Sequence, residues 1–203
     1  MDKAAPVDPR VHELIRRRWS PRAFADRPVD PPALRSLLQA AQWAPSSYNE
    51  QPWAFVVATR DAPESYERLM GCLVPYNQNW AKSAPVLAVS VAKAAFDRNG
   101  KPNLHAFHDV GLAVAQLTLQ ATAEGLAVHQ MAGFDADRAR RALEIPDGWD
   151  PVAAIALGHP ADPETLPPDV RDKELAERER KPLSEFVFSG TWGEPASAVT
   201  ART

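Results

Sequence analysis

Residues 43–55 read WAPSSYNEQPWAF, a polar loop bounded by prolines that joins two apolar stretches. Before it, residues 31–44 carry apolar side chains at the spacing of one helical face: Leu34, Leu37, Leu38, Ala41 and Ala44. After it, residues 54–59 (AFVVAT) are rich in strand-forming residues, which predicts a buried strand. The short polar side chains and free backbone amides of such a loop could bind a ligand. The alternative is an ordinary turn with side-chain caps.

The rest of the chain continues this mixture of helix and strand. Apolar runs predict three further strands, at 84–92, 126–131 and 151–159. Periodicity and capping residues predict helices near 11–18, 62–72, 104–124 and 135–145, with Asp135 as an N-cap. The longest, Leu104–Glu124, is rich in alanine, so we place it centrally. The expected fold is one α+β domain, a mainly antiparallel sheet flanked by helices.

The C-terminal part differs in composition from the rest. Residues 160–181 are charged and interrupted by prolines, whereas 182–192 (PLSEFVFSGTW) are apolar again. An apolar strand after a polar arm needs a surface on which to bury, and a partner subunit is one candidate. We expect a single domain over 1–203, ordered over about 10–192, with 193–203 as a tail.

Composition narrows the class of partner. The 203 residues carry a formal charge of −3, so the chain as a whole does not favour nucleic acid or an anionic membrane. No apolar run is long enough for a membrane span, and the N-terminus lacks a signal region, which predicts a cytoplasmic protein. Cys72 is the only cysteine and is expected to be a buried hydrophobe, with no disulfide and no thiolate zinc cluster.

A local basic run, RRRWSPRAFADRPV (residues 16–29), stands out against that balance. Arg18, Ser20 and Arg22 alternate, so an extended segment would point them to one side. Two guanidinium groups and a hydroxyl there suit a phosphate or a carboxylate; the alternative is a solvated basic patch.

Together, the basic run and the loop resemble the nitroreductase family of FMN-dependent oxidoreductases. Arg18-x-Ser20-x-Arg22 is similar to the family's N-terminal run, and Pro45–Trp53 to its Pro-Ser-Ser-x-Asn-x-Gln-Pro-Trp loop. Further along, YNQNWAKSAPVLAV, GLAVHQMAGFD and RERKPLSEFVF resemble three more family landmarks in the same order. The resemblance covers roughly residues 10–192.

The resemblance implies a bound FMN and its contacts, with no catalytic side chain because the flavin carries the chemistry. Arg18, Ser20, Arg178 and Arg180 would hold the phosphate, beside the backbone of Trp19. Arg22 would lie beside flavin N1, Asn77 at the pyrimidine edge, and Met131, Ala132 and Gly133 at O4 and N5. The partner subunit's loop would supply Pro45, Ser46, Ser47, Asn49 and Gln51. The resemblance thus implies a homodimer with an exchanged C-terminal arm and FMN sites at its interface.

The implied reaction is ping-pong transfer of a hydride from NADH or NADPH to flavin N5, and then to a nitroaromatic or quinone-like acceptor. Two alternatives stay open: another flavin reaction of the same family, such as dehalogenation or heterocycle oxidation, and a non-catalytic flavin-binding or regulatory protein. Tyr48, Trp80, Phe107 and Phe134 are candidates for the substrate pocket.

Three departures from the family pattern affect the site. Trp19 stands where relatives often have Arg or His, and its backbone is expected to contribute more than its side chain. Trp80 stands where some relatives have a lysine, and the excursion Lys93–His108 is short compared with relatives that fold a helical lid there. We expect no metal site, because the scattered histidines, His105, His108, His129 and His159, suit surface or capping roles.

Overall fold

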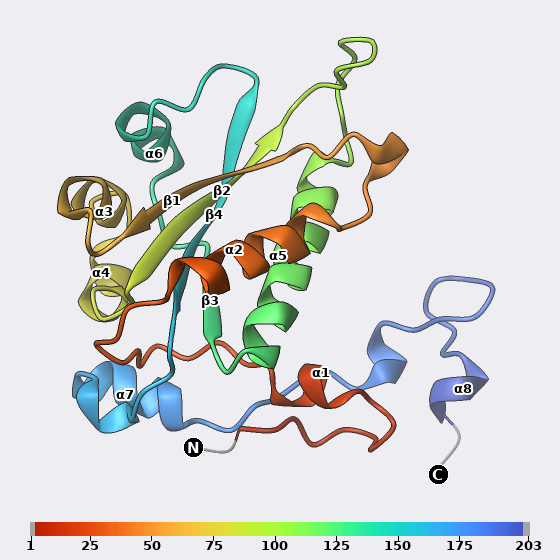
Figure 1. Ribbon diagram of the computed structural model, residues 1–203. Helices are drawn as coiled ribbons and strands as arrows, with labels where there is room; N and C mark the ends of the chain where they lie inside the picture. The colour runs from red at the N-terminus through yellow and green to blue at the C-terminus, as the bar shows by residue number, and fades with distance from the viewer. Residues whose placement is uncertain (1–2, 201–203) are drawn as a thin grey trace.

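A four-stranded sheet with helices on both faces forms the centre of the molecule in the computed structural model, which describes residues 3–200 (Figure 1). The strands are β1 (Trp53–Thr59), β2 (Val86–Lys93), β3 (Ala127–Met131) and β4 (Trp149–Gly158). Their order is β1-β2-β4-β3, and every neighbouring pair is antiparallel. The expected α+β class with an antiparallel sheet is confirmed.

Eight helices and three short 3-10 turns connect and cover these strands in the described part of the chain. The helices are α1 (Glu13–Arg17), α2 (Pro31–Gln42), α3 (Pro63–Met70), α4 (Pro75–Ala81), α5 (Ala106–Ala123), α6 (Ala136–Ala142), α7 (Pro168–Leu175) and α8 (Ser197–Thr200). The turns are η1 (Ser47–Asn49), η2 (Pro163–Thr165) and η3 (Leu183–Glu185). Four of the helices begin with a proline: α2, α3, α4 and α7. Proline suits the first turn because it lacks a backbone N–H, and an N–H at that position would have no partner within the helix.

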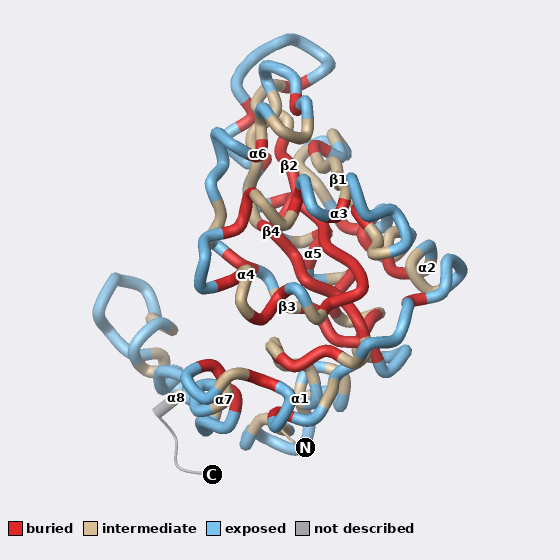
Figure 2. The backbone as a smooth tube through the Cα atoms, turned by 90° about the vertical axis from the view of Figure 1, so that its left-hand side faces the viewer, coloured by how far each residue is buried: buried red, intermediate tan, exposed pale blue. Residues whose placement is uncertain are grey.

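The central strand β2 contributes to two cores at once. Leu87 and Val89 belong to one buried cluster, and Val86 and Ala88 belong to the other. Because successive side chains of a strand point to opposite faces, a strand covered on both faces is apolar throughout. Figure 2 shows this buried region running through β2, β4 and α5.

Helices α2 and α5 cover one face of the sheet. Val110, Val114 and Leu117 of α5 are buried there at helical spacing. The opposite side of α5 is exposed although it carries the apolar or small residues Phe107, Gly111 and Ala115. The longest helix therefore packs centrally, as expected, and keeps one apolar side free within this chain.

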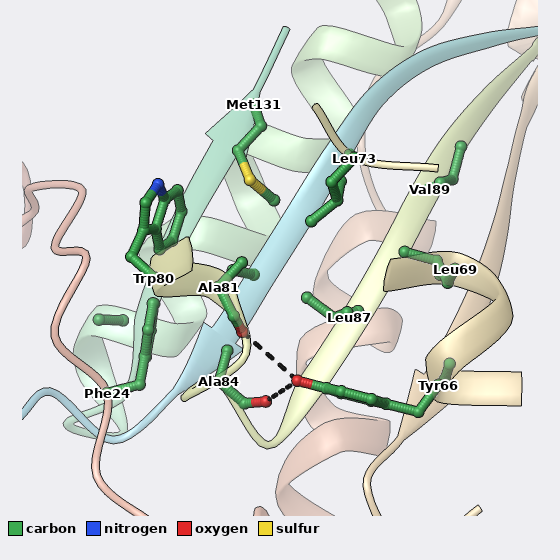
Figure 3. Close-up of a cluster of buried hydrophobic side chains, with 14 of the residues drawn as sticks. Phe24, Tyr66, Leu69, Leu73, Trp80, Ala81, Ala84, Leu87, Val89 and Met131 are labelled. Carbon is green, nitrogen blue, oxygen red and sulfur yellow. Dashed lines mark hydrogen bonds between the residues drawn. The ribbon is translucent and has the colours of Figure 1, made fainter. Parts of the chain in front are cut away.

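Helices α3, α4 and α6 lie on the other face. Figure 3 shows the core between α3, α4 and the sheet, with Trp80 stacked near Phe24 at a ring-centroid distance of 6.5 Å. The Tyr66 hydroxyl donates to the carbonyl oxygens of Ala81 and Ala84, which ties α3 to the end of α4. This core fixes α4, which carries the candidate site residue Asn77 as well as the core residue Trp80.

The N-terminal segment and the segment after β4 lie together at one end of the sheet. The backbone of the N-terminal segment pairs with the segment after β4 through Phe24 and Pro160. Beyond α7, the C-terminal arm (residues 176–200) extends away from the body in both views (Figures 1 and 2). The strand expected over 182–192 was a wrong prediction: these residues form the turn η3 and irregular backbone, and their strand-like pairing among the described residues is the isolated bridge of Phe188 with Pro195. In the described residues, no helix is both long and apolar enough to cross a membrane.

Candidate functional site

The basic run follows α1 as extended backbone and meets the C-terminal arm. Arg18 donates from Nη1 to the Ser20 hydroxyl at 3.2 Å. Arg178 donates to the carbonyl oxygens of Arg18 (2.9 Å) and Arg16 (3.1 Å). Residues 160 positions apart are thus brought together, as the expected phosphate site requires.

The charges in this cluster are unbalanced. Burial lowers the pKa of Arg18 below its ordinary value, and the neighbouring cations Arg178 and Arg180 lower it further. Within residues 3–200, no carboxylate forms an ion pair with any of these three guanidinium groups. Three mutually repelling cations that lack a protein counter-charge are suited to bind an anion.

Arg22 lies in the same segment but in a different environment. Its Nη1 is 3.8 Å from Oε2 of Glu174, a residue of α7. Its Nε is buried and has no hydrogen-bond partner among the described residues. A buried N–H group without an acceptor is costly, so a ligand that supplied an acceptor to this side of the guanidinium would be stabilised.

Asn77 of α4 is held in one orientation by two hydrogen bonds. Its Nδ2 donates to the Gly133 carbonyl at 2.9 Å, and its Oδ1 accepts from Nε1 of Trp80 at 3.2 Å. A Cβ at position 133 would lie 2.5 Å from that Nδ2 and 3.1 Å from the Val74 side chain. Only glycine therefore permits this close approach between α4 and the segment after β3.

Trp80 links this pair to the basic run. Its ring is 1% exposed and lies 4.6 Å from the ring of His129, whose Nδ1 is 2.9 Å from the Pro21 carbonyl oxygen. A carbonyl oxygen only accepts, so Nδ1 is the donor. Burial lowers the pKa of His129 from 6.5 to about 4, against the effect of its backbone bonds. The imidazole is therefore neutral near pH 7.

Two sequence expectations are corrected here. Trp80 is a core residue covered on all sides, so the expectation that it could stack on a substrate does not fit its burial. His129, expected at the surface or as a cap, instead packs between Trp80 and the basic run. No pattern in the sequence marked His129, because its partners lie far away along the chain.

The segment after β3 lies beside Asn77. Met131 is buried at the end of the strand, Ala132 is exposed and Gly133 is half-buried. Phe134 is half-buried, and its backbone pairs with Leu73. The structure therefore assembles one group of expected site residues from four separate segments: Arg18, Ser20, Arg22, Asn77, Met131, Ala132, Gly133, Arg178 and Arg180.

The loop after α2 lies elsewhere. Figure 1 shows η1 at the end of the sheet opposite the basic run. The Ser46 hydroxyl accepts from the Gln51 amide at 2.9 Å, and the Ser47 amide donates to Asp109 at 2.9 Å. Pro45 is exposed at the start of this loop. Within one chain, the loop and the cationic cluster are not part of the same site.

This loop has an unusual backbone. Tyr48, Asn49 and Gln51 have φ values of 56°, 57° and 52°, in the left-handed region that side chains seldom adopt. Backbone strain of this kind occurs mostly at functional sites.

Exposed aromatic and basic side chains surround the loop. Tyr48 is 73% exposed and Phe107 is 53% exposed. The Arg98 guanidinium, from the 93–108 excursion, lies 3.8 Å from the centroid of the Tyr48 ring. The excursion carries no helical lid: it is closed by a backbone pairing of Ala95 with Pro102.

Metal chemistry finds no support in the described residues. Among residues 3–200, no group of three or more His, Cys, Asp or Glu side chains is placed to hold a metal ion. Cys72 is buried, and burial raises the pKa of its thiol, so it is not a reactive thiolate at neutral pH.

Comparison with known proteins agrees with this geometry. A solved structure described as an oxidoreductase containing FMN is 37% identical, with 94% of each chain covered and a TM-score of 0.85. A candidate nitroreductase from Desulfovibrio desulfuricans, solved in complex with FMN, is 27% identical, with 92% of this chain and 99% of its own covered and a TM-score of 0.70.

Sequence relatives point the same way. A candidate NADH dehydrogenase/NAD(P)H nitroreductase from Streptomyces coelicolor is 30% identical over 160 residues, which are 70% of this chain and 78% of its own. The sequence profile of the Nitroreductase family matches residues 15–159, which include the basic run, the serine–asparagine loop, Asn77 and Gly133. The chain belongs to the nitroreductase family, a family of oxidoreductases.

Proposed function

We propose that this chain is an FMN-dependent oxidoreductase that takes electrons from NADH or NADPH and passes them to a nitroaromatic or quinone-like acceptor. The names of its relatives support the chemistry, since two similar structures contain FMN and one relative is named for NAD(P)H. The observation that carries the proposal is the cationic cluster of Arg18, Arg178 and Arg180.

The cluster fits the phosphate of FMN. The positive charges of Arg178 and Arg180 act on Arg18, and none of the three guanidinium groups forms an ion pair with a carboxylate among the described residues. The Ser20 hydroxyl lies next to Arg18. Each charge-assisted hydrogen bond to a phosphate contributes roughly 1.5–3 kcal/mol. A dianionic phosphate would relieve the repulsion that lowers the pKa of Arg18.

The residues further along fit a flavin ring. Arg22 offers a buried N–H that lacks an acceptor, and Asn77 and Gly133 are held together as a fixed polar pair. When bound, FMN supplies a carrier for hydride and electrons, so no nucleophilic side chain is needed. The protein's own task is to hold the ring and to place charge beside it. Because His129 is neutral near pH 7, Arg22 would supply the positive charge at one edge of the flavin ring.

We also propose that two copies of the chain complete two sites. The strained 45–51 loop lies at the opposite end of the sheet from the cluster, so it would serve the partner's flavin through Pro45, Ser46, Ser47, Asn49 and Gln51. The free apolar side of α5 and the exposed arm residues Leu183 (55%) and Phe186 (57%) would be covered in such a dimer. The arm would then be exchanged between subunits.

In that dimer the exposed aromatic residues would line the acceptor pocket. Tyr48 and Phe107 present their rings to solvent in one chain, and Phe134 follows Gly133. Because the 93–108 excursion forms no helical lid, the pocket would be open to flat aromatic acceptors of different sizes.

The test is the identity of the cofactor followed by steady-state kinetics. The purified protein should release FMN, identified by mass spectrometry, and should oxidise NADH or NADPH with menadione as acceptor. Parallel double-reciprocal lines would support a pocket used by donor and acceptor in turn. A protein that cannot be loaded with FMN would refute the proposal, and an FMN-loaded protein without turnover would favour the non-catalytic alternative.

A further inference from the structure

Glu174 is a buried carboxylate in a mostly exposed and charged segment, whose other buried helical residue is Val170. It is the penultimate residue of α7, and its side chain is 1% exposed. Removing a carboxylate from water costs several kcal/mol unless hydrogen bonds and a counter-charge compensate. The partners of Glu174 therefore show what its burial achieves.

All of its hydrogen-bond donors come from the basic run. Oε1 accepts from the backbone N–H of Arg22 at 2.9 Å and of Ala23 at 3.3 Å, and Oε2 accepts from the Arg22 N–H at 3.0 Å. An extended segment outside the sheet has few backbone partners of its own. Glu174 therefore fixes the main chain at the residue whose side chain faces the proposed ring.

The same carboxylate also lies beside the side chain of Arg22. Oε2 is 3.8 Å from Nη1, and the structure describes no other cation within ion-pair distance of Glu174. Because the carboxylate lies on the Nη1 side, the unpartnered Nε remains available on another side of the same guanidinium. The positive charge of Arg22 is thus partly offset before any ligand binds.

We infer that Glu174 is a positioning residue for Arg22: it clamps the Arg22 backbone and offsets part of its charge, and so lowers the reduction potential of the bound flavin. The inference rests on the proposed function, because it concerns the charge that develops on the flavin ring upon reduction. It assigns to α7 a part in tuning the flavin, although Glu174 is not itself among the proposed cofactor contacts.

Two substitutions separate the clamp from the charge. Glu174→Gln keeps the side-chain length and one oxygen for the Arg22 and Ala23 amides, but removes the negative charge. Glu174→Asp keeps the charge but is one methylene too short for the same hydrogen bonds. Glu177→Gln, at an exposed position three residues after Glu174, is the matched control for loss of one carboxylate.

The experiment measures the midpoint potential of each protein kept saturated with FMN, and the dissociation constant for oxidised FMN. In Glu174→Gln, the preference for reduced over oxidised flavin should increase about tenfold, which raises the two-electron potential by about 30 mV. Glu174→Asp should bind oxidised FMN several-fold more weakly without that rise. Glu177→Gln should match the wild type.

Each outcome decides between the inference and its alternatives. An unchanged or lower potential in Glu174→Gln, or the same rise in Glu177→Gln, would overturn the inference and leave the proposed function intact. If Glu174→Gln does not fold, Glu174→Asp decides, because the negative charge persists in that variant. A raised midpoint potential in Glu174→Asp would overturn the inference, whereas weaker FMN binding at an unchanged potential would support it. A wild-type protein that binds no FMN would overturn both proposals.

Discussion

Arg18 and Arg22 lie four residues apart, yet the structure gives them different neighbours. Arg18 faces Arg178 and Arg180 without a carboxylate, whereas Arg22 has one guanidinium edge beside Glu174 and a free Nε. We assign Arg18 to the phosphate, a charge present in both redox states, and Arg22 to the ring, where charge appears only on reduction. Their substitution should therefore have different effects.

Arg22→Gln should lower the flavin potential, because it removes a cation that favours the reduced ring. If that interaction contributes roughly 1.5–3 kcal/mol, the decrease is about 30–65 mV for a two-electron couple. Arg18→Gln should instead weaken FMN binding with little change in potential. Spectroelectrochemical titration with saturating FMN measures both variants, and an equal decrease in the two would show that the assignment is wrong.

Gly133 allows the close approach of Asn77. In Gly133→Ala the new Cβ would lie 2.5 Å from Asn77 Nδ2, so the amide must move and its bond to the Gly133 carbonyl must break. The affinity for FMN should fall by about tenfold or more, as expected for one lost hydrogen bond plus local strain. Titration of the folded variant with FMN, followed by flavin fluorescence, measures this. Wild-type affinity would contradict the account of this contact.

His129 should make stability depend on pH. Its pKa is lowered by burial from 6.5 to about 4, so the unfolded chain binds a proton more readily than the folded chain between these values. The stability present above pH 6.5 should be lost as the pH falls towards about 4, by at most about 3 kcal/mol. Urea unfolding of the apo-protein at pH 7 and near pH 4.5 measures the change. A His129→Gln variant with the same pH dependence would contradict this assignment.

At the scale of elements, α4 and α7 are two helices that the sequence did not predict. Each is short: α4 spans Pro75–Ala81 and α7 spans Pro168–Leu175. Helices of this length are stabilised by tertiary packing, not by their own periodicity. Residues of α4 nevertheless pack through Trp80 into the core, and α7 is anchored through Val170 and Glu174. Both helices contribute to the site, and both were hidden in segments that looked irregular or charged.

Helix α5 carries the prediction about assembly. Ala115 is exposed on its free side together with Phe107 and Gly111, so Ala115→Glu should not disturb the fold of one chain. If this side is buried between subunits, a carboxylate there should dissociate the dimer, because obligate interfaces commonly bury about 2,000 Å² or more of mostly apolar surface. Sedimentation at micromolar concentration measures the change.

A matched control is the same substitution at Ala62, an exposed residue just before α3. It should leave the oligomeric state unchanged. A stable dimer in Ala115→Glu, or a monomeric wild type that retains FMN, would contradict the proposed arrangement.

For the whole molecule, the sequence predicted the sheet, its four strands and the segments that form the cationic cluster. Alternation and periodicity of apolar residues predict single strands and helices. The order and spacing of the motifs identified Arg18, Asn77 and Gly133. Glu174 and His129 could not be identified in this way. Their burial depends on partners 152 and 108 positions away, and nothing local distinguishes them from solvated side chains. The apolar arm was misassigned as a strand, since apolar composition alone does not supply a neighbouring strand for it to pair with.

The central claim is that one end of the molecule holds the phosphate of FMN. Titration of the apo-protein with FMN and with riboflavin, which lacks the phosphate, tests it most directly. The account predicts that the wild type binds FMN at least about 100-fold more tightly, given several charge-assisted bonds of roughly 1.5–3 kcal/mol each. Arg18→Gln should reduce the affinity for FMN and leave that for riboflavin unchanged. Equal affinities of the wild type for the two ligands would contradict the claim.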